Sequence, residues 1–247
     1  MIWSIDIAMV NIKNLISALL PEQLEVYNGS VAVTDSSVIE QFVKREANTF
    51  LVSFPRTGSH WLRMIMELYF KRPSLVRIFY FPEITDYLTL HTHDKDLSVE
   101  RKNVIYLYRD PVETVYSQLN YYNENINDQS RIIYWADQYG RHLDKWLYAE
   151  SFTKKKTILT YGGMKHNMED EFRKITDHFG EDLNRNMLLD SVAMITKQEV
   201  KKKTSHDQQV VQLSSDYEDL RDNFRLLNGT LVMNAVLKGR THLLKYL

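Results

Sequence analysis

The chain contains no cysteine among its 247 residues. This absence excludes disulfides, thiol nucleophiles and cysteine-ligated metal sites, and it fits a reducing compartment, which we expect to be the cytoplasm. An excess of charge is also missing, because the formal net charge is −1. No global field therefore draws the chain toward nucleic acid or anionic membranes, so we expect no nucleic-acid partner. Any anionic ligand has to be held by local basic groups.

Long uninterrupted hydrophobic runs are missing as well. The N-terminal segment 1–21 comes closest, but Asp6, Asn11 and Lys13 interrupt it and no basic region precedes it. We expect a packed N-terminal helix here rather than a signal peptide or an integral membrane segment. A surface that contacts substrate, membrane or a carrier protein is the alternative. No internal repeat or Pro/Gly/Ser-rich linker divides the chain, so we expect a single domain over residues 1–247.

Strand-like and helix-like patterns alternate along the chain. Three short apolar runs are typical of buried strands: 49–54, 103–108 and 156–160. Helical spacing recurs between and after them: 59–70, 111–122, 131–150, 164–179 and 184–195. This alternation predicts an α/β fold with a central parallel sheet flanked by helices. Ligands of such sheets bind beyond the carboxyl ends of the strands.

The first chemical motif, residues 53–61, follows the first strand and opens a helix. Gly58 permits a tight turn, and the helix N-terminus offers free N–H groups and a partial positive charge. Arg56 adds a guanidinium, and Thr57 and Ser59 add hydroxyl groups. These features predict an anion site. The segment is not a Walker A motif, which argues against nucleoside triphosphate hydrolysis. An ordinary strand–turn–helix connection with a surface arginine is the alternative.

The second motif pairs Arg109, at the end of the second strand, with Ser117, about two turns into the next helix. A guanidinium and a hydroxyl can grip a phosphate monoester between them. The alternative is an arginine that pairs with Asp110 or Glu113 and a serine that faces solvent.

Two histidines, His91 and His93, lie between these motifs. The pKa of an unperturbed imidazole lies near neutral pH, which suits a general base. A metal site that also uses Asp94 or Asp96 is one alternative. A pair of surface histidines in a loop is another.

The motifs resemble those of PAPS-dependent sulfotransferases, where PAPS is 3′-phosphoadenosine 5′-phosphosulfate. The letters F-P-R-T-G-S-H-W are similar to the family loop Y-P-K-S-G-T-T-W, which holds the 5′ phosphosulfate. Arg56 stands where cytosolic members carry Lys, and His60 replaces a Thr. The letters I-Y-L-Y-R-D-P-V-E-T-V-Y-S resemble the second signature, I-Y-L-x-R-N-x-x-D-x-x-x-S, whose Arg and Ser bind the 3′ phosphate. Arg109 and Ser117 fall on those two positions.

Three further positions follow from the resemblance. His93 takes the place of the catalytic histidine in the family's K-T-H, with His91 in place of the Lys. Tyr161 matches the Tyr of Y-E-D-M-K, which contacts adenine, and Trp61 is either a core residue or an adenine-stacking ring. The C-terminal Lys238-Gly239-x-x-x-x-x-Lys245 is similar to R-K-G-x-x-G-D-W-K, which implies a 3′-phosphate contact from Lys238 or Arg240.

The resemblance implies a P-loop-like sulfotransferase fold and transfer of a sulfuryl group from PAPS to a hydroxyl or amine of a small-molecule or glycan acceptor. PAP (3′,5′-bisphosphoadenosine) is the product, and no metal is expected. His93 is the implied general base, and Arg56 stabilises charge on the transferring group. The implied nucleotide-binding residues are Arg56, Thr57, Gly58, Ser59, His60, Trp61, Arg109, Ser117, Tyr161, Lys238, Gly239 and Arg240. A nucleotide-binding module without transfer activity and a small-molecule kinase are the alternatives.

Overall fold

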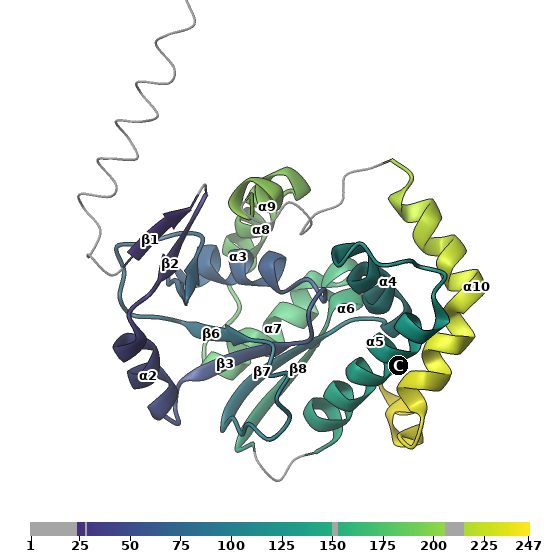
Figure 1. Ribbon diagram of the computed structural model, residues 1–247. Coiled ribbons are helices and arrows are strands. Elements are labelled where there is room, and N and C mark those ends of the chain that lie inside the picture. The colour runs from purple at the N-terminus through teal and green to yellow at the C-terminus, as the bar shows by residue number, and fades with distance from the viewer. Residues whose placement is uncertain (1–23, 28, 150–152, 206–214) are drawn as a thin grey trace, which may run out of the picture.

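The computed structural model describes residues 24–247 apart from residues 28, 150–152 and 206–214 (Figure 1). The N-terminal segment 1–21, for which we expect a packed helix, lies outside the described residues. A five-stranded parallel sheet forms the centre, which confirms the predicted fold class. In spatial order its strands are β4 (Ser74–Leu75), β6 (Thr89–Thr92), β3 (Thr49–Ser53), β7 (Asn103–Tyr108) and β8 (Lys155–Thr160).

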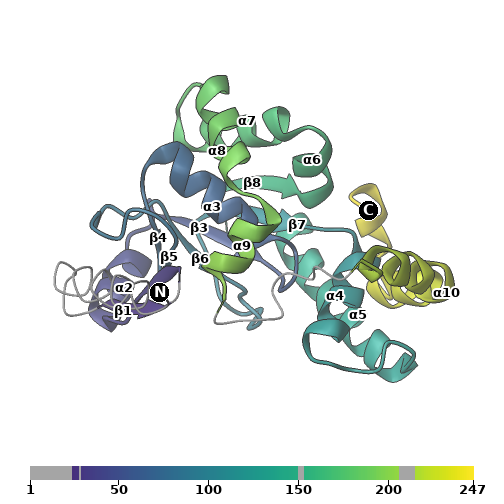
Figure 2. The ribbon, with the colours of Figure 1, turned by 90° about the horizontal axis from the view of Figure 1, so that it is seen from above.

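Helices cover both faces of this sheet (Figure 2). One face carries α4 (Pro111–Tyr121), α5 (Gln129–Leu143) and α10 (Tyr217–Leu237). The other face carries α3 (Ser59–Phe70), α7 (Met168–Phe179) and α8 (Arg185–Met194). Side chains alternate across a strand, so Val104 and Tyr106 of β7 join the first core whereas Ile105 and Leu107 join the second. The central strands are therefore apolar on both faces, as the sequence pattern indicates.

A small antiparallel sheet, which the sequence pattern does not predict, adjoins this architecture. It consists of β1 (Leu24–Tyr27), β2 (Ser30–Val33) and β5 (Arg77–Ile78). The remaining elements are α2 (Ser36–Lys44), α6 (Tyr161–His166), α9 (Lys197–Lys203), a π-helical turn (Asp144–Tyr148) and a 3₁₀ turn (Thr241–Lys245).

Local sequence explains where the helices near the motifs begin. The Asp110 carboxylate accepts the backbone N–H of Glu113, and Pro111 occupies the first turn of α4. The predicted helix over 164–179 is instead two helices, α6 and α7. Asn167 separates them, because its non-helical backbone (φ −147°, ψ 71°) ends α6 while its side chain accepts the backbone N–H of Asp170 at the start of α7.

A fully buried carboxylate, Glu67, ties α3 to the segment that follows it. Its two oxygens accept backbone N–H groups of Ser74 (3.1 Å), Phe79 (2.9 Å) and Tyr80 (2.8 Å). Burial raises the pKa of this carboxyl to about 7, and Arg63 one turn earlier in the helix opposes the shift. The side chain thus replaces backbone pairing for a segment with only two two-residue strands.

The sheet order explains how distant motifs meet. Ser53 at the end of β3 lies opposite Leu107 of β7, and Val52 lies opposite Thr92 of β6. The chain beyond these three strand ends carries Arg56, His93 and Arg109. Their carboxyl ends share one edge of the sheet, so residues more than fifty positions apart in sequence come together there.

Candidate active site

A cavity of about 560 Å³ lies where the motifs meet. It is formed by the ends of β3, β6 and β7, by α3, α4, α6 and α9, and by the start of α10. The predicted site residues that line it are Arg56, Gly58, Ser59, His60, Trp61, His93, Arg109, Ser117 and Tyr161.

The turn before α3 requires glycine at position 58. Its φ of 93° lies in the left-handed region, and a Cβ atom there would lie 2.5 Å from the ring of Tyr161. Arg56 is also left-handed, with φ 72°. Gly58 caps α3 without a side-chain bond, so the N-terminal N–H groups of this helix have no capping side chain.

Thr57 plays a different part from the one predicted. Its side chain is fully buried, does not line the cavity and donates its hydroxyl to the carbonyl oxygen of Phe54 at 2.8 Å. The hydroxyl therefore closes the turn rather than facing the cavity.

The two motifs contact one another directly. Arg56 Nε donates to Ser117 Oγ at 3.2 Å, and its guanidinium lies over the Tyr121 ring. Arg109 Nη1 donates to the Arg56 carbonyl at 3.3 Å. Ser117 is buried rather than exposed to solvent. The loop and the arginine–serine pair thus form one cluster.

Arg109 also forms the ion pair that the sequence left open. Its Nε and Nη2 donate to Glu113 Oε2 at 2.9 and 2.7 Å, and its guanidinium lies 4.7 Å from the centre of the Tyr161 ring. Arg109 still lines the cavity. The ion pair orients the guanidinium instead of removing it from the site.

The cavity has a strong excess of positive charge. One carboxylate, Glu218, lines it among the described residues, and it lies 3.8 Å from Lys197. The cationic side chains of the lining are Arg56, Lys95, Arg109, Lys165, Lys197 and Arg221. The whole chain has a net charge of −1, so this concentration of cations is local and favours a polyanionic ligand.

His93 is held in a defined tautomer. Its Nδ1 lies 2.8 Å from the carbonyl oxygen of Ser53. A carbonyl oxygen only accepts hydrogen bonds, so Nδ1 carries the proton and Nε2 has the free electron pair. Burial lowers the pKa of His93 below its usual value, against a smaller opposing effect of that hydrogen bond. The ring is therefore neutral near pH 7.

The neighbouring histidines support His93. His91 Nε2 lies 3.0 Å from Ser53 Oγ, and its ring meets the His93 ring edge-on with 4.7 Å between centroids. Burial lowers the pKa of His91 well below its usual value. His142 Nε2 lies 2.9 Å from the His93 carbonyl, and its Nδ1 lies 2.9 Å from the Tyr106 hydroxyl.

These histidines are not grouped with acidic ligands. Within the part of the chain that the structure describes, no cluster of three His, Asp or Glu side chains can hold a metal ion. Asp94, a possible third ligand in the sequence, pairs with Arg101 at 2.9 Å. The geometry gives no support to the metal alternative.

His60 lines the cavity at the first turn of α3, in place of the family's Thr. Arg77 Nη1 lies 3.0 Å from His60 Nε2 and can only donate, so the neutral ring carries its proton on Nδ1. Burial lowers the pKa of His60 well below its usual value, and Arg63 and Arg77 add to this effect.

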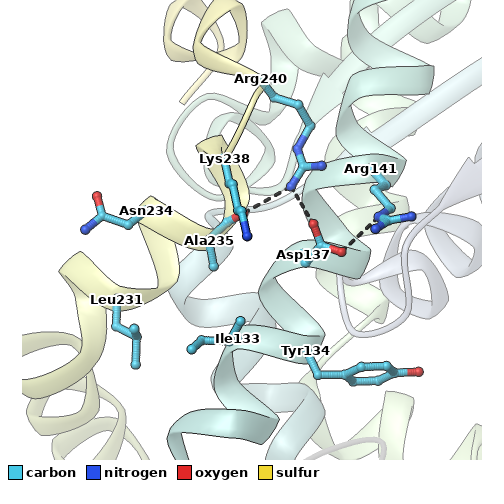
Figure 3. Close-up of a pocket in the computed structure, with 9 residues that line it drawn as sticks. All are labelled: Ile133, Tyr134, Asp137, Arg141, Leu231, Asn234, Ala235, Lys238 and Arg240. Carbon is cyan, nitrogen blue, oxygen red and sulfur yellow. Dashed lines mark hydrogen bonds and ion pairs between the residues drawn. The ribbon is translucent and has the colours of Figure 1, made fainter.

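The C-terminal residues predicted for the 3′ phosphate lie elsewhere. Lys238 and Arg240 line a second cavity of about 610 Å³ between α5 and α10 (Figure 3). The first turn of α10 lines the active-site cavity, and the last turn lies at the opposite end of a helix that is 21 residues, or about 31 Å, long. The structure therefore does not bring Lys238, Gly239 or Arg240 to the active-site cavity. The length of α10 is the reason.

Several lining residues were absent from the sequence prediction. Lys197, the first residue of α9, and Arg221, on α10, come from segments whose position depends on tertiary packing. Gln118 and Tyr121 follow Ser117 on the same helix, and the four-residue spacing from Ser117 to Tyr121 was a usable signal.

Comparison with known proteins gives a family and a fold. The family described as "Sulfotransferase domain" matches residues 81–224, which leaves the 53–61 loop outside the matched segment. No curated protein matches the sequence. Among the described residues, no helix combines the length and apolar character that a membrane span needs.

Solved structures of sulfotransferase type have the same fold. Mouse sulfotransferase SULT7A1 complexed with PAP is 19% identical, with 89% of this chain and 96% of that chain covered and a TM-score of 0.56. Retinol dehydratase with androsterone and inactive cofactor PAP is 11% identical (91% and 93% covered, TM-score 0.53). Its complex with retinol and PAP is also 11% identical (92% and 94% covered, TM-score 0.53). Since the family match spans more than half of the chain, the protein belongs to the sulfotransferase domain family.

Proposed function

We propose that this protein transfers a sulfuryl group from PAPS to an acceptor hydroxyl or amine and releases PAP, and that residues 1–247 form one sulfotransferase domain. The carrying observation is that the 53–58 loop, the Arg109–Ser117 pair and His93 line one cationic cavity in a member of this family. The presence of PAP in the three similar structures supports the choice of nucleotide.

The proposed nucleotide contacts follow from the chemistry of each wall. Arg56 and the N-terminus of α3 receive the 5′ phosphosulfate, because free N–H groups and a guanidinium suit an anion. Arg109 and Ser117 receive the 3′ phosphate. Trp61 and Tyr161, whose rings meet edge-on at 5.8 Å, offer aromatic surface to the adenine.

The proposed transfer uses His93 as the general base. Its Nε2 takes the proton of the acceptor group while the acceptor atom forms a bond to sulfur. The bond between sulfur and the bridging oxygen breaks, and that oxygen leaves as the 5′ phosphate of PAP. Arg56 and the α3 N–H groups stabilise the charge that accumulates on the leaving phosphate.

Two measurements test this proposal together. In a thermal-shift assay, PAP at 100 times its dissociation constant should stabilise the protein by about 2.7 kcal/mol. AMP at the same concentration should stabilise it less, since AMP lacks the 3′ phosphate. Equal shifts would contradict a dedicated 3′-phosphate site.

The second measurement is a screen with ³⁵S-labelled PAPS over phenols, alcohols, sugars and amines, in which we expect labelled product from at least one class. Binding of PAP without transfer to any acceptor would favour the nucleotide-binding module. Mg²⁺-dependent turnover of ATP would favour the kinase.

A further inference from the structure

An unpaired buried amide lies in the cavity wall. Gln118 of α4 lines the cavity, and its residue exposure is 1%. Neither its Nε2 nor its Oε1 has a hydrogen-bond partner. Among the described residues it is the one side chain that both lines this cavity and leaves buried polar atoms unpaired.

An unpaired buried amide is unfavourable unless a ligand supplies its hydrogen-bond partners. A buried amide that has lost its water and gained no partner destabilises the fold, and native proteins rarely keep one without a reason. A primary amide offers N–H donors and a carbonyl acceptor. A hydroxyl group, which both donates and accepts, is the simplest group that satisfies both sides.

The position of Gln118 favours the acceptor end of the cavity. Tyr121 and Tyr122, three and four residues further along α4, lie on the same helix face and also line the cavity. Arg56, which is proposed to receive the 5′ phosphosulfate, has its guanidinium over the Tyr121 ring, so this part of α4 borders the group that is transferred. Tyrosine rings combine apolar surface with a hydroxyl, which suits a molecule that has both characters.

The loop that carries His93 adds a polar group to the same cavity. Lys95 is exposed, lies two residues beyond His93 and lines the cavity. The lining therefore offers an ammonium, an amide and phenol hydroxyls besides the proposed base. An apolar acceptor would leave the buried amide of Gln118 without a partner.

We propose that the acceptor is a polyhydroxylated, carbohydrate-type molecule, with one hydroxyl sulfated at His93 and a second hydroxyl bonded to the amide of Gln118. This inference rests on the proposed function. A site built to bond a substrate hydroxyl discriminates strongly against an analogue that lacks it, because the buried polar group then stays unpaired. Androsterone, the ligand in one similar structure, is an alcohol without that second hydroxyl.

The test is single-turnover transfer from ³⁵S-labelled PAPS to the methyl glycosides of glucose, galactose and N-acetylglucosamine, with androsterone as the apolar alcohol. At least one glycoside should exceed androsterone at least tenfold in kcat/KM. Gln118→Leu should lose at least tenfold with that glycoside and nothing with androsterone. Asn120→Leu is the matched control, because the Asn120 amide bonds to the Tyr116 carbonyl of its own helix and does not line the cavity.

Two further readouts separate this role from others. The melting temperature of Gln118→Leu should equal or exceed that of the wild type, because an unpaired amide has been removed. A lower melting temperature together with loss of transfer to every acceptor would mean that Gln118 has a packing role, and it would overturn the proposal. PAP affinity by calorimetry should change less than twofold. Weaker PAP binding would assign the partner hydroxyl to the ribose of the nucleotide and also overturn it.

The remaining outcomes are equally decisive. Transfer to androsterone or phenols but to no glycoside overturns this inference and leaves the proposed function intact. Absence of PAP binding defeats the proposed function itself. Should Gln118→Leu fail to fold, Gln118→Met gives the same comparison with a more adaptable side chain.

Discussion

The two large cavities of this protein have similar volumes, and cations outnumber carboxylates in both linings, but the cavities differ in how their cations are paired. In the cavity between α5 and α10, Asp137 lies between Arg141 and Arg240 and accepts from both at 2.8 Å. Arg240 also donates to the carbonyls of Ala235 and Val236 near the end of α10. In the active-site cavity the cations of the lining far outnumber its carboxylate.

The comparison shows that basic residues alone do not define an anion site. Arg240 is occupied by a carboxylate and by helix carbonyls, so it stabilises the packing of α5 against α10. Arg109 also has a carboxylate partner, but it lies beside Arg56 and Ser117 on the wall of a cavity. The positive charge available to a ligand depends on what surrounds each cation.

Substitutions of a histidine in each of the two regions should differ most in their effect on the rate of sulfuryl transfer. His93→Ala should reduce single-turnover transfer by roughly 10²–10⁴-fold with little change in PAP affinity, because a general base acts on the acceptor. His242→Ala, a histidine paired with Asp144 outside the active-site cavity, is the matched control and should retain activity. Full activity of His93→Ala would show that His93 is not the general base.

The pH profile of kcat/KM sharpens the same point. The pKa of His93 is lowered, so the ring loses its proton below the usual histidine range and is already basic at neutral pH. The rate should stay flat above pH 6.5 and fall only at lower pH, where the ring is protonated. His91→Ala should cost less than His93→Ala, whereas equal losses together with inhibition by EDTA would favour a metal site.

Two glycines provide the next comparison. Gly58→Ala forces a left-handed alanine and a methyl group into the Tyr161 ring, so it should destabilise the protein by about 2–5 kcal/mol. Gly239→Ala, with φ 71° and no atom within 4 Å of the new Cβ, incurs only the backbone strain, about 1–2 kcal/mol. Urea denaturation of both variants measures the difference. Equal losses would mean that the Tyr161 ring moves aside freely.

Substitution of Arg109 and of Arg240 should have different effects on nucleotide affinity. Arg109→Ala should weaken PAP binding by about 1.5–3 kcal/mol, because a charge-assisted contact is lost. Arg240→Ala should leave PAP affinity unchanged and lower the melting temperature. Titration calorimetry with PAP and AMP checks both variants. An Arg109→Ala defect of equal size with AMP would show that the residue does not serve the 3′ phosphate.

The smallest expected effect belongs to Ser117→Ala. A neutral hydroxyl contact contributes about 0.5–1.5 kcal/mol, so PAP affinity should fall less than in Arg109→Ala. The matched control is Ser130→Ala, an exposed serine in the first turn of α5 that lies outside the cavity. A larger loss for Ser117→Ala than for Arg109→Ala would point to disruption of the Arg56 position rather than to a lost phosphate contact.

The sequence predicted the parts of the site that depend on local structure. The strand over 103–108 and the helix that starts at Asp110-Pro111 are determined by an apolar run and a capping pair, so Arg109 and Ser117 could be placed correctly. Gly58 was predictable because a strand that turns directly into a helix needs such a residue.

The incorrect site predictions concern residues whose position depends on tertiary packing. Lys238 and Gly239 match a family pattern by letter, yet only the path of α10 determines which end of that helix lines the active site. Arg221 has no local signal, because nothing in its neighbours indicates that its helix begins beside the nucleotide loop. Thr57 has the expected residue type, but its hydroxyl is used within the turn.

The buried carboxylate of Glu67 has a consequence for local opening of the fold. Ser74, Phe79 and Tyr80 belong to a segment with little regular structure, whose amides would ordinarily exchange with solvent quickly. Their N–H groups donate to a carboxylate in the interior of α3, so they exchange only when α3 itself separates from this segment. These three amides therefore report on the same opening event as the core of the helix whose first turn lines the active-site cavity. Slow exchange in an irregular segment would then follow the stability of this cavity wall, although none of the three residues belongs to either sequence motif.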